Sequence, residues 1–255
     1  METILTSAGS SLDPDWIRAE FKRRRGHWHD DWEAMLSYSP AYVAAYLDFS
    51  VYSDEQGSIS PKLRELIYVA TNCSPTHMFE KGFKNHARQA LDLGASPSEL
   101  LSVVATVSAM GIHSYLLAAE AIAEFAPGEI VVDEPSATMV RKEHLAVFGA
   151  VLEEVQAGIK LDPKFYQCWL NFAAAPMRGP DATLSMKEAH LIALAVHAQV
   201  TQLNPVGVRQ HVRAALEHGA SAREVLDVCK QISSMGIHAM VFGLPIINSL
   251  TRGGV

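Results

Sequence analysis

The chain has 255 residues, a formal net charge of −7, 49% hydrophobic residues and 19% charged residues. This composition is typical of a globular protein, and the negative charge removes any general affinity for nucleic acid or anionic membranes. The three cysteines form neither a C-x-x-C motif nor an even set. The sequence shows no signal-peptide core and no apolar run near the ~18–20 residues of a membrane span. We therefore expect a cytoplasmic protein that binds neither nucleic acid nor a membrane.

Helix start and stop signals recur along the chain, whereas strand signals are few. Serine before a proline, capping boxes and glycines after apolar periodic segments define a first set of elements. In chain order these are an aromatic segment at 39–49, a helix from Ser60 to about Asn72, a helix that carries His86 and stops at Gly94, and a capped apolar helix from Leu100 to about Phe125. We expect three helices after the aromatic segment.

A second set follows a linker rich in proline and acidic residues. Its elements are an aromatic segment at 162–172, a helix opened by a capping box at Ser185, a helix from Asn204 to Gly219, and an apolar helix from Val225 to about Leu244. Aligning 60–113 with 185–238 gives 22 identities in 54 positions without a gap. An ungapped match of this length indicates one structural unit used twice.

We predict an all-α fold built from two tandem helical repeats. The first is 1–126 with a core at 60–125, the linker is 127–136, and the second repeat is 137–255 with a core at 185–248. The aromatic segments match at an offset of 123 residues, whereas the cores match at 125. Residues 1–37 show no convincing second copy beyond a weak helical match.

The repeat sorts the eleven histidines into duplicated and single ones. His86 and His211 are duplicated within H-x-R-x-A-L, and each has a glycine one turn earlier, Gly82 in the first repeat. The glycine either leaves space for a ligand beside the imidazole or permits close helix packing against a core histidine. His113 and His238 are duplicated after a glycine in the long apolar helix. Each is either a buried hydrogen-bonding group or a second imidazole that converges on the first.

Thr76 and Thr201 are shared by the two repeats just before the helices that carry the first pair of histidines. A hydroxyl at that place can bind a carboxylate, or it can simply cap a turn. His77, His86 and His113 are three possible metal ligands in the first repeat. Because the second repeat has no histidine at the position of His77, and the spacing matches no metal-site signature, we predict no metal.

Arg64-Glu65-Leu66, followed by His86-Ala87-Arg88-x-Ala90-Leu91-x-x-Gly94-Ala95-Ser96-x-x-Glu99, resembles the carboxymuconolactone decarboxylase family, which also contains alkyl hydroperoxide reductase D proteins. The segment from His211 to Glu224 carries the same resemblance, which covers about 60 residues in each half. The resemblance implies an all-helical, cofactor-free protein that assembles into homo-oligomers, either a trimer or a dimer of tandem chains.

The chain departs from both branches of that family. Where the peroxidase branch has C-x-x-C, the sequence has Phe79 and Gly82 in the first repeat, and Asn204 and Gly207 in the second. Loss of these thiols excludes dithiol redox chemistry. The decarboxylase branch carries a glutamate on the same face, and here that residue is glycine.

The resemblance implies a lyase that decarboxylates a small carboxylated lactone or keto acid from aromatic-compound catabolism. His86 or His211 would donate the proton, with His113 or His238 as its partner. The candidates for substrate binding are Thr76, Thr201, Gly82, His77 and Glu65. The last two are titratable groups that favour the first repeat as the active one. The alternatives are a non-catalytic ligand-binding or assembly module, and a metal-dependent hydrolase or oxygenase that uses the histidines.

Overall fold

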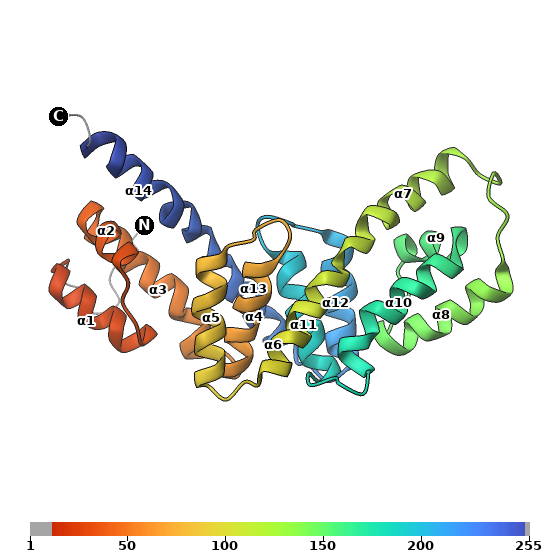
Figure 1. The fold of residues 1–255 in the computed structure, drawn as a ribbon, viewed down its shortest axis with the longest axis horizontal. Coiled ribbons are helices and arrows are strands. Elements are labelled where there is room, and N and C mark those ends of the chain that lie inside the picture. Colours follow the sequence, from red (N-terminus) through yellow and green to blue (C-terminus); the bar gives the residue numbers. More distant parts are fainter. Residues whose placement is uncertain (1–11, 253–255) are drawn as a thin grey trace, which may run out of the picture. The chain divides into compact units, whose positions relative to one another are not determined.

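The computed structural model describes residues 12–252, in which every regular element is a helix and no strand occurs (Figure 1). The first half contains α1 (Pro14–Arg25), α2 (Asp30–Tyr38), α3 (Pro40–Gln56), α4 (Pro61–Cys73), α5 (Glu80–Asp92), α6 (Pro97–Ser108), the 3₁₀ turn η1 (Ala109–Gly111) and α7 (Ile112–Phe125). The second half contains α8 (Glu134–Phe148), α9 (Glu153–Leu161), α10 (Pro163–Arg178), α11 (Met186–Ala198), α12 (Pro205–Glu217), α13 (Ala222–Ser233), the 3₁₀ turn η2 (Ser234–Ile237) and α14 (His238–Arg252). The predicted all-α class is confirmed.

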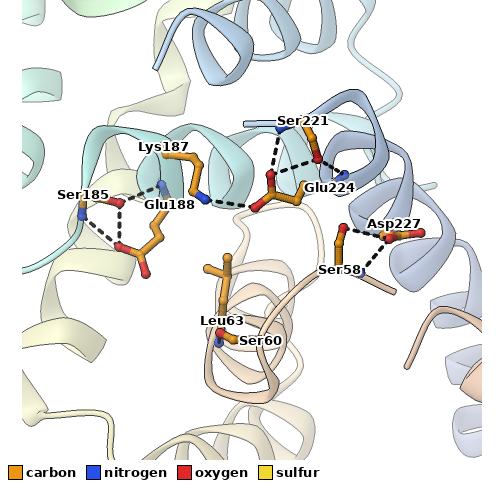
Figure 2. A network of polar contacts seen from close by, with 9 residues as sticks. All are labelled: Ser58, Ser60, Leu63, Ser185, Lys187, Glu188, Ser221, Glu224 and Asp227. Carbon is orange, nitrogen blue, oxygen red and sulfur yellow. Dashed lines mark hydrogen bonds and ion pairs between the residues drawn. The ribbon is translucent and has the colours of Figure 1, made fainter. Parts of the chain in front are cut away.

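The predicted capping signals lie at helix ends. Ser96 and Ser185 each form a complete capping box with a glutamate three residues later. Figure 2 shows the Ser185 box together with the equivalent contacts between Ser221 and Glu224. Glu224 also forms an ion pair with Nζ of Lys187 at 2.9 Å. One glutamate therefore caps α13 and ties it to α11. Local side-chain chemistry explains why these helices begin where they do.

The long third helix of each repeat is interrupted, which the sequence did not predict. A 3₁₀ turn ends at Gly111 before α7 and covers Gly236 before α14. Glycine has a low helix propensity, and 3₁₀ turns commonly interrupt helices. The chain thus changes its hydrogen-bond pattern just before His113 and His238.

The repeat is also longer than predicted. Helices α1 and α2 have counterparts in α8 and α9, at the same 123-residue offset as the aromatic segments. Gly26 and Gly149, 123 residues apart, both adopt a left-handed conformation and cap the first helix of each repeat. Glycine meets this backbone requirement without steric strain. Side chains differ between these segments, so the match is visible in the backbone and hidden in the sequence.

The chain divides into two compact units that do not follow the repeats. Of the described residues, 12–57 and 233–252 form one unit, and Ser58–Ile232 forms the other. In the first unit, Ile237 and Leu244 of the C-terminal elements join the buried core of α1, α2 and α3. In the second unit, α7 packs on α9, where Tyr115 donates a hydrogen bond to the carbonyl of Gly158 at 2.8 Å. The last helix of each repeat therefore packs on the leading helices of the other repeat.

Two helical stretches, Pro97–Phe125 and Ala222–Thr251, are long and apolar enough to cross a membrane by length and composition alone. This differs from the expectation that no segment reaches that length. Both stretches run through a 3₁₀ turn, and α6 in the first of them packs against α4, α10 and α11. Core helices of soluble proteins pass the same test of length and composition.

Candidate functional site: a histidine cavity

A cavity in the unit Ser58–Ile232 is lined by both repeats. The first repeat contributes α6, η1 and α7, and the second contributes α8 to α12. The volume of the cavity is about 30 Å³, so a ligand larger than a few waters requires movement of the lining. The lining residues are Thr106, Ala109, Met110, Ile112, His113, Leu116, His144, Phe148, Val155, Tyr166, Trp169, Ala173, Met177, Ala193, His197, Val206, Gln210 and His211.

His211 is held in one orientation by His190. The Nδ1 atoms of the two rings lie 3.1 Å apart, and Nε2 of His190 lies 2.9 Å from the carbonyl oxygen of Val147. A carbonyl only accepts, so Nε2 of His190 donates and its Nδ1 carries a lone pair. His211 must then donate from Nδ1, which leaves a lone pair on its Nε2. The hydrogen-bond chain therefore assigns His211 the tautomer of a base.

The equivalent two positions of the first repeat also contact each other, but one of the two side chains differs. Nδ1 of His86 lies 2.7 Å from a carboxylate oxygen of Glu65, and the His86 ring stacks on Tyr68 at 4.4 Å. Glu65 and His190 occupy equivalent positions 125 residues apart, as do His86 and His211. Glu65, which we expected to bind substrate, thus orients a histidine. One repeat pairs the ring with a carboxylate and the other pairs it with an imidazole.

Two further imidazoles lie near His211. His197 stacks on His211 with a centroid separation of 5.2 Å, and the ring of His113 meets His197 edge to face at 4.5 Å. Burial lowers the pKa of His113 to about 4 and that of His197 to about 3. Burial also holds the pKa of His211 well below its ordinary value. The cluster is therefore uncharged at neutral pH, because the apolar surroundings disfavour the imidazolium form.

Part of the lining consists of rings whose polar atoms are hydrogen-bonded to other groups of the protein. Both ring nitrogens of His144 are used, Nδ1 at 3.0 Å from the Tyr166 hydroxyl and Nε2 at 3.0 Å from the Ala150 carbonyl. Trp169 donates from its indole nitrogen to the Ala109 carbonyl at 2.8 Å. This bond joins α10 to the 3₁₀ turn. His144 and Trp169 thus support the lining, and their polar atoms are already paired.

Two buried polar atoms of the lining have no hydrogen-bond partner among the described residues. They are Nδ1 of His197 and Oε1 of Gln210. The amide orientation of Gln210 is set by its nitrogen, which donates to the carbonyls of Phe148 and Ala150 at 3.3 and 3.2 Å. His197 is 1% exposed and Gln210 is 5% exposed, so solvent does not replace the missing partners. Unsatisfied buried polar atoms are rare and mark sites where a ligand can bind.

The glycine before each histidine accommodates a side chain of the preceding helix. A Cβ atom added to Gly207 would lie 2.4 Å from Cγ of His197. At Gly82 it would lie 2.3 Å from Oδ1 of Asn72, the residue equivalent to His197. Of the two roles considered for this glycine, the contacts match close helix packing, because a neighbouring side chain fills the space beside the imidazole. In the second repeat that side chain is itself part of the cavity.

Other predicted site residues are not among those that line this cavity. The Thr76 and Thr201 hydroxyls hydrogen-bond each other at 3.1 Å, where the two repeats meet in the second unit. His77 packs near Phe79 at a ring separation of 5.7 Å, and it does not line the cavity. His238 opens α14 in the other unit.

The expected pairing of histidines within one repeat differs from the structure. His113 of the first repeat lines the same cavity as His211 of the second, since α7 packs on the leading helices of the second repeat. His190 and His197 were missed as site residues because neither is duplicated. Their seven-residue spacing on α11 places them two turns apart on one helix face, which is the signal that identifies them. Among residues 12–252, no group of three or more His, Cys, Asp or Glu side chains is arranged to hold a metal ion.

Comparisons with known proteins agree with this architecture. A model of the carboxymuconolactone decarboxylase family matches residues 40–125 and 163–245. A solved structure from Burkholderia xenovorans LB400, described as a "putative gamma-carboxymuconolactone decarboxylase subunit", is similar with a TM-score of 0.84 and 28% identity, over 95% of this chain and 99% of that chain. No curated protein matches the chain. Because the two family matches together cover more than half of its residues, the chain belongs to the carboxymuconolactone decarboxylase family.

Proposed function

We propose that the protein is a cofactor-free lyase that decarboxylates a small carboxylated lactone or keto acid in its histidine cavity. The observation that carries this proposal is the hydrogen-bond chain from Val147 through His190 to His211. It leaves a lone pair on Nε2 of a buried histidine that lines a cavity walled by aromatic rings. Membership of the family and the name of the Burkholderia protein favour this reaction class.

The proposed reaction needs one proton and one electron sink. Nε2 of His211 accepts the proton that enters with the substrate, and the carboxylate then loses carbon dioxide. The electron pair of the broken C–C bond moves into the adjacent carbonyl and forms an enolate. His211 returns its proton to the enolate carbon and regains its neutral form. The net change is uptake of one proton and release of one carbon dioxide.

His113 and His197 have complementary roles in this proposal. Both rings are neutral, because burial lowers their pKa values. A neutral imidazole can donate a hydrogen bond to a developing oxyanion without being a charged group in the resting site. His190 does not touch the substrate and is a positioning residue. Its bond to Val147 keeps the lone pair of His211 on Nε2.

The test is carbon dioxide release from a panel of carboxylated lactones and β-keto acids. The variant His211→Asn keeps an amide donor near Nδ1 and removes Nε2, so release is expected to fall by a factor of at least about 100. His86→Asn makes the same change at the equivalent position and is the matched control. If only His86→Asn abolishes release, the site proposed here is wrong. Loss of release on adding a chelator would favour the metal-dependent alternative.

A further inference from the structure

The lining of the histidine cavity contains polar side chains but no formally charged one. Among the residues that line it, none is Lys, Arg, Asp or Glu. The charge of Arg178 acts on His190, and His190 does not line the cavity. A ligand with two carboxylates would bury at least one charge without a counter-charge, which is strongly unfavourable.

Two acceptor atoms of the cavity favour a ligand that donates a hydrogen bond. Of the two unpaired atoms, Nδ1 of His197 accepts or donates according to its tautomer, whereas Oε1 of Gln210 only accepts. Nε2 of His211 likewise only accepts in the tautomer set by His190. A carboxylate has no hydrogen to offer either acceptor. A protonated carboxyl group or an enolic hydroxyl satisfies one of them directly.

The apolar surface of the cavity favours a flat, compact ring. Phe148 and Trp169 are nearly parallel, with 5.9 Å between their centroids, and Tyr166 meets Trp169 edge to face at 4.9 Å. Met110 and Met177 complete the lining. Their unbranched thioether chains can change rotamer to admit a ring, which rigid aromatic residues cannot do as readily.

We propose that this cavity binds a single-ring compound with one acidic group, takes it up together with one proton, and discriminates against dicarboxylates. This inference names the ligand class of the proposed active site and rests on that site being the functional one. A muconolactone that carries two carboxylate groups lies outside this ligand class. The proton lies between the acidic group of the ligand and Nε2 of His211.

The surroundings of His211 explain why the proton arrives with the ligand. The titratable groups whose charges act on it are imidazoles, His190 and His197 from α11, His113 from α7 and His144 from α8, and the other titratable group of the lining is the Tyr166 hydroxyl. None of these supplies a negative charge that would stabilise an imidazolium in the empty cavity. The anionic ligand supplies that charge, so binding and proton uptake are coupled.

Calorimetry with stable ring acids tests the inference separately from turnover. The full chain is titrated at pH 7 with benzoate, which has one carboxylate, and with phthalate, which has two, in buffers of different ionisation enthalpy. We expect uptake of close to one proton per benzoate bound and at least tenfold weaker binding of phthalate. Gln210→Met is expected to weaken benzoate binding about tenfold, whereas Gln167→Met, on α10 outside the cavity, leaves it unchanged.

Each outcome has a defined meaning. Equal affinity for the two acids, binding of benzoate without proton uptake, or no binding of either acid at millimolar concentration overturns the ligand class. Proton-coupled binding of benzoate with no carbon dioxide release from any ring keto acid supports the ligand class and removes the lyase. Carbon dioxide release from dicarboxylates alone retains the lyase and overturns the ligand class.

Discussion

The Nδ1 atoms of His190 and His211 lie 3.1 Å apart in the second repeat. The equivalent positions of the first repeat hold Glu65 and His86, whose carboxylate oxygen and Nδ1 are separated by 2.7 Å. In both repeats a residue on the preceding helix forms a hydrogen bond with Nδ1 of the histidine. The duplicated histidine therefore keeps its orientation, while its partner is charged in one repeat and neutral in the other.

Introducing the carboxylate of the first repeat into the second is expected to change the protonation of His211. In His190→Glu, a negative charge beside Nδ1 favours the imidazolium, so the pKa of His211 should rise by about one to three units. Titration of the ring by NMR measures this shift. His190→Gln removes the imidazole without adding charge and is the control. A pKa of His211 that is the same in the two variants would contradict the assigned pairing.

The histidine cluster predicts loss of stability in mild acid. Burial lowers the pKa of His113, His144 and His190 to about 4, and that of His197 to about 3, whereas an unfolded histidine titrates near 6.5. The unfolded state thus binds more protons between these values. Stability is full above about pH 6.5 and falls as the pH drops toward 4, by about 1.4 kcal/mol per pH unit for each histidine.

Urea unfolding at pH 7, 6 and 5 measures this slope. The variant His197→Asn removes one of the groups, so its slope is expected to be smaller by about one proton. A free energy of unfolding that stays constant from pH 7 to pH 5 would show that these rings are not buried in the neutral form.

The close contact between Gly207 and His197 predicts a steric cost. In Gly207→Ala the new Cβ would lie 2.4 Å from Cγ of His197, so the ring or the helix must move. We expect a loss of about 1–3 kcal/mol in unfolding free energy. Gly111→Ala is the matched control, because no atom lies within 4 Å of its Cβ position. Equal stability of the two variants in chemical denaturation would rule out the proposed packing role.

Exposed apolar residues at equivalent positions predict self-association. Leu117 on α7 is 66% exposed and Phe242, 125 residues later on α14, is 73% exposed. Ile122 and Ile247 repeat the pattern one turn and a half further along. Large exposed apolar surfaces commonly mark interfaces. We propose that both helices contact other copies of the chain, as expected for a homo-oligomer.

Sedimentation of Leu117→Glu and Phe242→Glu tests this proposal. Both variants are expected to have a smaller mass in solution than the unchanged chain. Val131→Glu, at a residue that is 94% exposed in the linker, is the control and should sediment like the unchanged chain. An unchanged chain that sediments as a monomer would exclude self-association through these helices.

The sequence predicted part of the site and missed the rest for physical reasons. His211 was found because the repeat duplicates it. The start of its helix was also predicted, because Asn204 before a proline is a recognisable N-cap. His197 and His190 were missed because the first repeat has Asn72 and Glu65 in their places. Thr76 and Thr201 were expected to bind substrate, yet they face each other across the junction of the repeats. A shared residue can serve the contact between two copies as readily as a ligand.

The sequence by itself determined the helical class, the tandem repeat and most helix ends, because caps, glycine stops and apolar periodicity act over a few residues. Only the tertiary structure decided which helices share a cavity. Helix α7 leaves its own repeat at a 3₁₀ turn and packs on α9, so His113 lines a cavity with His197 and His211. That choice depends on which apolar faces fit together over long sequence distances, and no local pattern encodes it.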